Sequence, residues 1–134
     1  MTTPLSLIAR KAELTGLRNA LDIGGAKVLF YTGTVPPLPD DPTAETLIGT
    51  IPLSATSGVV GASALLATLT LTVPQVAPAA ATGQIGFVRL VNGAGVGFMD
   101  LPAGVAGSGM PVIVNATLVY AGGELQLVSC VIAK

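Results

Sequence analysis

The chain has 134 residues and a formal net charge of −1, with six basic residues, seven acidic residues and no histidine. Only 10% of the residues are charged, against about 25% in an ordinary soluble domain. Without a basic excess the chain lacks the electrostatic footprint that a phosphate backbone requires, so we expect no nucleic-acid partner. Because histidine is the usual general base and the commonest metal ligand, we also expect no catalytic residue, no cofactor and no metal.

The length corresponds to one domain, and its core must be built from small side chains, because 51% of the residues are hydrophobic but only 4% are aromatic. After residue 45 the only formal charges are Arg89, Asp100, Glu124 and Lys134. So few charges leave neutral or apolar patches on the surface, and such patches usually mark protein contacts. A net charge close to zero also favours association between copies.

Residues 1–25 predict an N-terminal arm with a short helix. The segment carries a helix start, a leucine stripe at helical spacing and a helix stop: Thr3-Pro4; Leu14, Leu17 and Leu21; and Gly24-Gly25. Two interpretations stay open, an amphipathic arm that docks on a partner and a helix that covers one end of the sheet. We expect residues 26–134 to fold without this arm, and attachment to a partner to weaken when the arm is removed.

Beyond residue 25 the pattern is that of short strands separated by turns. The predicted strands span residues 27–32, 46–53, 64–73, 84–91, 96–101, 112–120 and 125–133. Asn92-Gly93 predicts a tight hairpin turn, and residues 34–43 form a proline-rich loop. The expected fold class is all-β, a single antiparallel β-sandwich domain over residues 26–134, with a jelly roll as the variant.

No motif supports chemistry or a membrane span. Ser108 lacks the spacing of a hydrolase nucleophile, and Cys130 lies in an apolar run that predicts a buried side chain. The acidic residues near position 40 lack the ligand order of a calcium loop. The long charge-free stretch up to residue 88 is broken by prolines and is rich in Thr and Gly, so we expect no membrane partner.

Four cations are candidates for a protein interface. Arg10, Lys11 and Arg18 fall within the predicted helix with few acids around them. Arg89 is a lone guanidinium on an otherwise apolar strand, where it must find a carboxylate, backbone carbonyls or a partner subunit. Asp100 follows on the next strand, so an intramolecular Arg89–Asp100 bond and an interface role are both open.

Several short motifs, taken in their order along the chain, cover most of its length. They are Arg18 and Asp22 in the helix, KVLFYTGTVP at 27–36, LIGTIPL at 47–53, Thr82-Gly83 before FVRL at 87–90, Asn92-Gly93, Gly107-Ser108-Gly109 and the closing hairpin. In this order the chain resembles the small cement or decoration proteins of tailed-phage capsids, some of which are jelly rolls. The resemblance implies a non-enzymatic virion protein on the capsid exterior that binds the major capsid protein, bridges neighbouring subunits and associates with itself as a homodimer or homotrimer.

A tail or fibre-tip module that recognises a host surface glycan is the alternative. Such a module would favour exposed Trp or Tyr platforms, and the chain offers only Tyr31 and Tyr120. The oligomeric state and the capsid position stay open at this stage.

Overall fold

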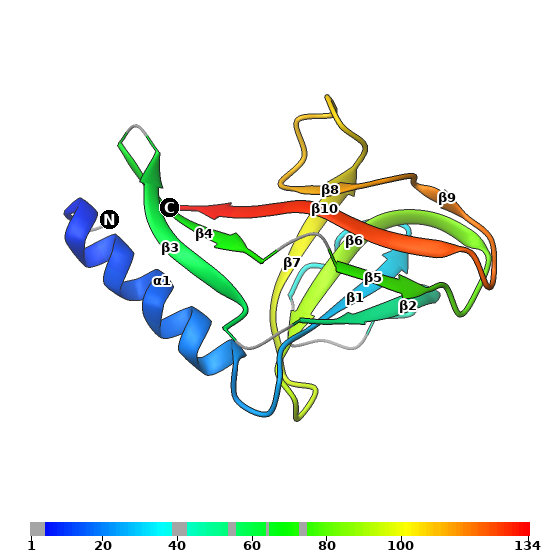
Figure 1. Cartoon of the computed structure of the whole chain (residues 1–134), viewed down its shortest axis with the longest axis horizontal. Helices are drawn as coiled ribbons and strands as arrows, with labels where there is room; N and C mark the ends of the chain where they lie inside the picture. Colours follow the sequence, from blue (N-terminus) through cyan, green and yellow to red (C-terminus); the bar gives the residue numbers. More distant parts are fainter. Residues whose placement is uncertain (1–4, 39–42, 54–55, 64, 73–74) are drawn as a thin grey trace.

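The computed structural model describes residues 5–38, 43–53, 56–63, 65–72 and 75–134. Within these ranges it confirms an all-β fold accompanied by one helix (Figure 1). The elements are α1 (Leu7–Leu21), β1 (Lys27–Thr32), β2 (Leu47–Pro52), β3 (Gly58–Ser63), β4 (Leu66–Leu71), β5 (Gln75–Pro78), β6 (Gly83–Val91), β7 (Gly97–Gly104), β8 (Val112–Val114), β9 (Leu118–Val119) and β10 (Glu124–Ala133).

The described strands form one hydrogen-bonded sheet in the order β2-β1-β6-β7-β8-β10-β4-β3, with β5 paired to β10 and β9 paired to β6. Every pairing is antiparallel except that of β7 with β8. This parallel pairing spans only two residue pairs. The loop at residues 105–111 carries the chain back from the end of β7 to the start of β8, so that the two strands run in the same direction. The sheet is therefore mixed and continuous, which differs from the two antiparallel layers expected of a sandwich.

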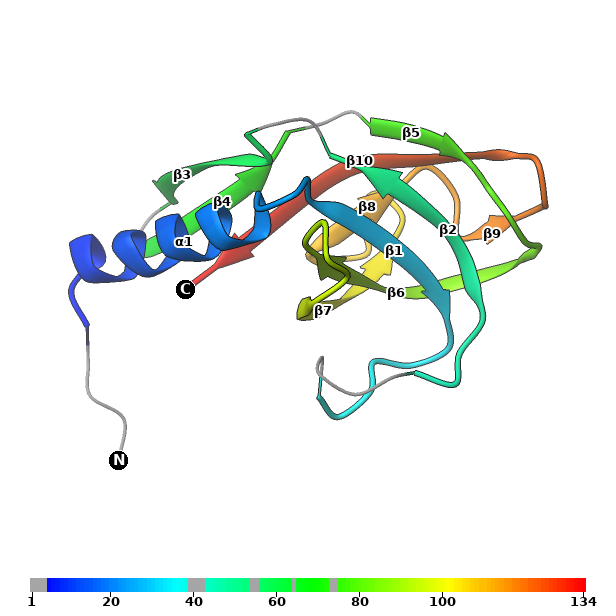
Figure 2. The same cartoon turned by 90° about the horizontal axis from the view of Figure 1, so that it is seen from below.

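The sheet curls until β2 lies close to β5 (Figure 2). The carbonyl oxygen of Ile48 on β2 accepts hydrogen bonds from Ala80 N at 2.7 Å and Ala81 N at 3.2 Å, just after β5. The enclosed space is filled by small and medium side chains. Gly49 pairs with Phe30, and a Cβ on Gly49 would lie only 2.5 Å from Leu125 Cδ1, so the leucine occupies the space that the glycine leaves.

The long strand β10 joins two parts of the molecule. Its first residues pair with β5 and its last three pair with β4. Its buried residues are Leu125 and Leu127 in the first half but Cys130 and Ile132 in the second, so the buried positions change parity. The pairing with β8 shifts register between Leu127 and Ser129, and an extra residue of this kind produces that change.

Helix α1 packs on one face of the strands β3 and β4 (Figure 2). It begins after Ser6, whose hydroxyl accepts from Ala9 N at 3.2 Å and so caps the first turn. Leu14 and Leu21 belong to the same buried cluster as the strands. The helix therefore covers the sheet, which is the second of the two interpretations, and Thr3-Pro4 lies outside the described residues.

Asp22 fixes the end of this helix to the sheet. It is the C-cap residue of α1, and its carboxylate oxygens accept from the backbone N–H of Ser57 at 3.1 and 3.4 Å. Because Ser57 directly precedes β3, this contact sets the position of the helix over β3 and β4.

The structure differs from the sequence prediction at several strands. It contains β3, which the sequence pattern does not predict, adds β5 after β4, and divides the expected 112–120 strand into β8 and β9. The β6–β7 hairpin is confirmed, but its turn is longer than predicted: the side-chain oxygen of Asn92 accepts from Ala94 N and Val96 N. In this turn the residue with a positive φ is Gly95. Position 93 requires glycine for another reason, because the backbone of Gly24 occupies the place where a Cβ would lie.

Truncation of a helix leucine tests how far α1 contributes to the core. Leu21 is completely buried whereas Leu65 is 83% exposed. We expect Leu21→Ala to lower the free energy of unfolding by about 2–5 kcal/mol and Leu65→Ala to change it by less than about 0.5 kcal/mol. Denaturant unfolding of both variants measures the difference, and equal stabilities would show that the helix adds nothing to the core.

Candidate interaction surface

The described residues offer few groups that could bind a metal ion or transfer a proton together. No group of three or more His, Cys, Asp or Glu side chains among them could hold a metal ion. A hollow of about 340 Å³ lies beside the β5–β10 pairing and is lined by residues 76–78 and 122–124, among which Glu124 is the only ionisable group. One carboxylate in a shallow hollow offers no acid–base pair.

Arg89 and Asp100 form a buried ion pair across β6 and β7. The two residues are directly paired in the strand register. The guanidinium donates from Nε to Oδ1 at 2.7 Å and from Nη2 to Oδ2 at 3.0 Å, the bidentate geometry that Arg favours with a carboxylate. Both side chains are more than nine-tenths buried. The structure thus shows the intramolecular bond, and Arg89 is not exposed as an interface cation.

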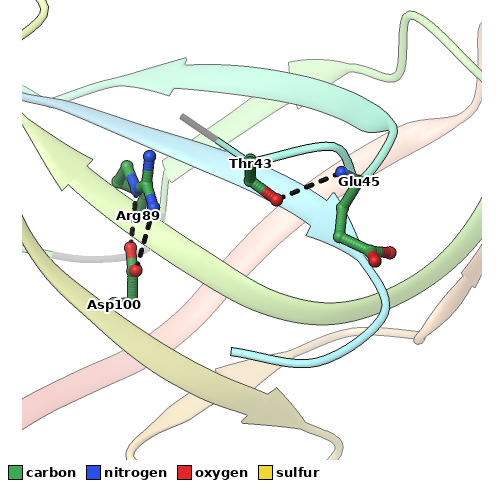
Figure 3. A network of polar contacts seen from close by, with 4 residues as sticks. All are labelled: Thr43, Glu45, Arg89 and Asp100. Atoms are coloured by element: carbon green, nitrogen blue, oxygen red, sulfur yellow. Dashed lines mark hydrogen bonds and ion pairs between the residues drawn. The ribbon is translucent and has the colours of Figure 1, made fainter. Parts of the chain in front are cut away.

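A second cross-strand pair lies next to this one. Tyr31 and Phe87 stack with ring centroids 5.3 Å apart, and they occupy paired positions on β1 and β6. Figure 3 places Thr43 and Glu45, which precede β2, near Arg89 and Asp100 on this outer side of the sheet. Glu45 N donates to Thr43 Oγ1 at 3.1 Å, and Thr32 Oγ1 donates to the Glu45 carboxylate at 3.3 Å.

The three cations of α1 lie on two different sides of the helix. Arg10 Nη1 donates to the carbonyl oxygen of Lys134 at 3.0 Å, so it faces the end of β10. Lys11 and Arg18 are seven residues apart and therefore share a side with Asp22, the residue that contacts the chain just before β3. Arg18 Nη2 donates to Asn19 Oδ1 at 3.2 Å. Lys11 and Arg18 thus form a pair of partly exposed cations, separate from Arg89.

Apolar side chains are exposed over the strands β3, β4 and β10 and at several loops. On the outer face of the extension, defined here as β3, β4 and residues 131–133, Val59, Thr70 and Val131 form one row across three strands. The next row is Gly61, Thr68 and Ala133. None of these six residues is charged, and Val59 is 67% exposed. The sequence signal for this face is weak because Gly, Ala and Thr occur throughout the chain.

Comparison with protein-family models, with curated proteins and with solved structures gave no match to this chain. The helix that the structure describes is too short and too polar to cross a lipid bilayer.

The buried ion pair predicts an asymmetric response to mutation. Arg89→Met leaves the Asp100 carboxylate buried without its charge partner, which costs about 3–5 kcal/mol of unfolding free energy. The double variant Arg89→Met/Asp100→Leu removes both charges, so we expect it to be more stable than the single variant. Arg10→Met is the matched control at a partly exposed site, and chemical denaturation of the three variants measures the order. A double variant less stable than Arg89→Met would contradict this account.

The single cysteine is predicted to be inert in the folded protein. Burial raises the pKa of the Cys130 thiol to about 12, so at pH 8 only about one molecule in ten thousand carries the reactive thiolate. We expect iodoacetamide to label Cys130 slowly in native protein and rapidly in guanidinium, followed by mass spectrometry. Equal labelling rates in the two conditions would mean that the thiol is accessible.

Proposed function

We propose that this protein is a structural component of a phage virion, a cement protein that binds the outside of the capsid and bridges subunits of the major capsid protein. The sequence resemblance supports this role, and the relation to jelly-roll cement proteins is part of the same proposal. The observation that carries it is the surface of the folded domain, which exposes many large apolar side chains and few charges.

This surface suits permanent contact with other proteins. A free monomer gains nothing from exposing Val59 and Leu65, at β3 and the turn after it, or Leu118 and Tyr120, at β9 and just after it. Burial of such side chains against another protein removes apolar area from water, which is favourable. A cement protein touches several shell subunits at once. Each contact can then be weak, because binding to one subunit raises the effective concentration at the next.

Lys11 and Arg18 are the cations that we assign to shell contact. They are partly exposed on the same side of α1 and are not paired with a carboxylate among the described residues. Carboxylates on the capsid surface would be their partners. Arg10 is engaged by the Lys134 carbonyl and Arg89 by Asp100, so neither is included in this assignment.

The second candidate is a tail module that recognises a host glycan. Tyr120 is 65% exposed and could stack on a sugar ring. Tyr31 already stacks on Phe87. One exposed tyrosine is a small platform, so this function is the weaker of the two.

Cosedimentation with shells of the parent phage assembled without this protein tests the proposal. We expect saturable binding at a fixed ratio to the major capsid protein. The double variant Lys11→Glu/Arg18→Glu should bind on the order of tenfold more weakly, because reversal of two charges opposes the shell carboxylates. Lys27→Glu, an exposed lysine at the start of β1, is the matched control and should bind like the wild type.

Two results would count against the cement role. The first is the absence of wild-type protein from the shell pellet. The second is retention of the protein on host cell envelopes in place of shells, abolished by Tyr120→Ala, which would assign it to the tail.

A further inference from the structure

Strand β3 leaves one edge of the sheet open. The hydrogen-bonded path ends at β2 and at β3. At β2, the Ile48 carbonyl is taken by Ala80 and Ala81, and Pro52 closes the strand. At β3, no described strand pairs with the outer edge, which forms the margin of the extension in Figure 2. Gly58 at the start of this strand is buried, whereas the residues from Val59 to Ser63 are partly or fully exposed.

The direction of the backbone groups in β4 follows from two sets of hydrogen bonds. Ala67 exchanges both backbone bonds with Lys134, at 2.9 and 2.8 Å, so Ala67 points toward β10. Thr72 N donates to Ser57 O at 2.8 Å, so Thr72 points toward the β3 side. Because bonding alternates along an antiparallel pair, Thr68 and Thr70 also point toward β3.

The same alternation assigns the residues of β3. Thr70 is paired with Val59 and Thr68 with Gly61, so Val59 and Gly61 direct their backbone groups to β4. Gly58, Val60 and Ala62 then direct their N–H and C=O groups away from the sheet. Among the described residues, none donates to or accepts from these groups outside the strand pairing.

Natural sheets usually protect such an edge with Lys, Pro, a bulge or a covering segment. Residues 58–63 read GVVGAS, with no charge and no proline. The register of β3 with β4 is regular over all six residue pairs, without a bulge. The edge is therefore straight, uncharged and able to accept another strand.

We propose that β3 pairs with β3 of a second copy of this chain, antiparallel about a two-fold axis at Val60. In this register Val60 meets Val60 of the partner, and Gly58 meets Ala62 of the partner. Val60 then exchanges both backbone bonds with Val60 of the partner, which is the condition for an isologous strand pair. The flanking bonds between Ala62, which is exposed, and Gly58 of the partner form when the backbone of Gly58, which is buried in the single chain, is uncovered. The two extensions become one continuous sheet.

The side chains of β3 are self-complementary in this register. Val59, on the outer face, lies directly beside Gly61 of the partner, so a large side chain meets the space left by a glycine. Gly61 has room of its own, because a Cβ there would lie 3.6 Å from Thr68 Oγ1. No charged residue occurs in the pairing strands, so two copies bring no like charges into the ladder.

The dimer is weak by itself. A standard interface buries about 800 Å² per partner. The six residues of β3 are only a small part of a chain whose total accessible surface is 6912 Å², so the area that they bury is smaller than this standard. Lys11 and Arg18 lie on the side of α1 nearest to β3, so pairing brings like charges closer together. We therefore expect the dimer to tighten as salt is added, because salt screens this repulsion.

This inference names the contact behind the self-association in the proposed function, but it does not rest on binding to the shell. Purified protein alone tests it, so failure to bind shells and failure to dimerise are separate results. We expect the wild type to show concentration-dependent dimers by sedimentation equilibrium up to about 1 mM. A wild type that stays monomeric over this range overturns the proposal.

Two single variants test the contact. Val59→Lys places two lysines diagonally across the axis, about 7–8 Å apart, and we expect it to raise the dimer dissociation constant on the order of tenfold. Val59→Thr, a neutral β-branched replacement, is the matched control and should dimerise like the wild type. Thermal unfolding of both variants checks that they are folded, and unchanged dimerisation of folded Val59→Lys overturns the proposal.

A mixing experiment tests the register. Gly61→Glu should also weaken its own dimer, because two glutamates then lie across the same axis. In a mixture of Val59→Lys and Gly61→Glu chains, the introduced lysine of one copy lies directly beside the introduced glutamate of the other. The heterodimer should therefore bind on the order of tenfold more tightly than either homodimer. Lack of a heterodimer in the mixture would show that β3 does not pair in this way.

Discussion

The fold depends on β10, which is the only described strand that belongs both to the curled sheet and to the extension. The strand β10 can belong to both the curled sheet and the extension only if the side of the strand that is buried changes at the point where it leaves the curled sheet and enters the extension. The register shift between Leu127 and Ser129 makes this change, since it puts Leu127 inside the curl and Ile132 inside the extension. Without the extra residue, either half of β10 would turn its apolar side chains to solvent.

The scarcity of large and charged side chains shapes the rest of the molecule. The core is close-packed by pairing small residues with larger ones, as where Gly49 leaves room for Leu125 beside Phe30. The buried ion pair of Arg89 with Asp100 occupies paired positions on neighbouring strands. That pairing brings the two charges together within one chain, without help from another subunit.

The two surfaces to which we assign contacts lie on the same part of the molecule. Lys11 and Arg18 are on α1, and the open strand β3 lies beneath that helix. Asp22 joins these elements through Ser57. Self-pairing of β3 would therefore place two copies of α1 on the same face of one continuous sheet, so that a dimer would present two sets of cations to a shell. A dimer of this kind gives the multiple attachment that a cement protein needs.

The sequence by itself determined the all-β class, the absence of histidine-based chemistry and several strand positions. The strand at Lys27–Thr32 was predicted at its observed bounds, because a short run of β-branched, aliphatic and aromatic residues between flanking glycines marks it locally. The buried character of Cys130 also followed from its neighbours. Arg89 and Asp100 could be recognised as one possible pair, but the choice between a pair and an interface required their register.

Only the tertiary structure decided which strands become neighbours and which edge stays open. The strand β3 consists of Gly, Val, Ala and Ser, so it carries no strong local signal and is stabilised by its partner β4. The turn at Asn92 also depends on the approach of Gly24 to Gly93, two residues far apart in the chain. The parallel pairing of β7 with β8 and the bulge in β10 likewise depend on contacts that no short stretch of sequence contains. Local sequence patterns indicate which residues are buried. Which strand or helix packs against each of those residues is a property of the whole fold.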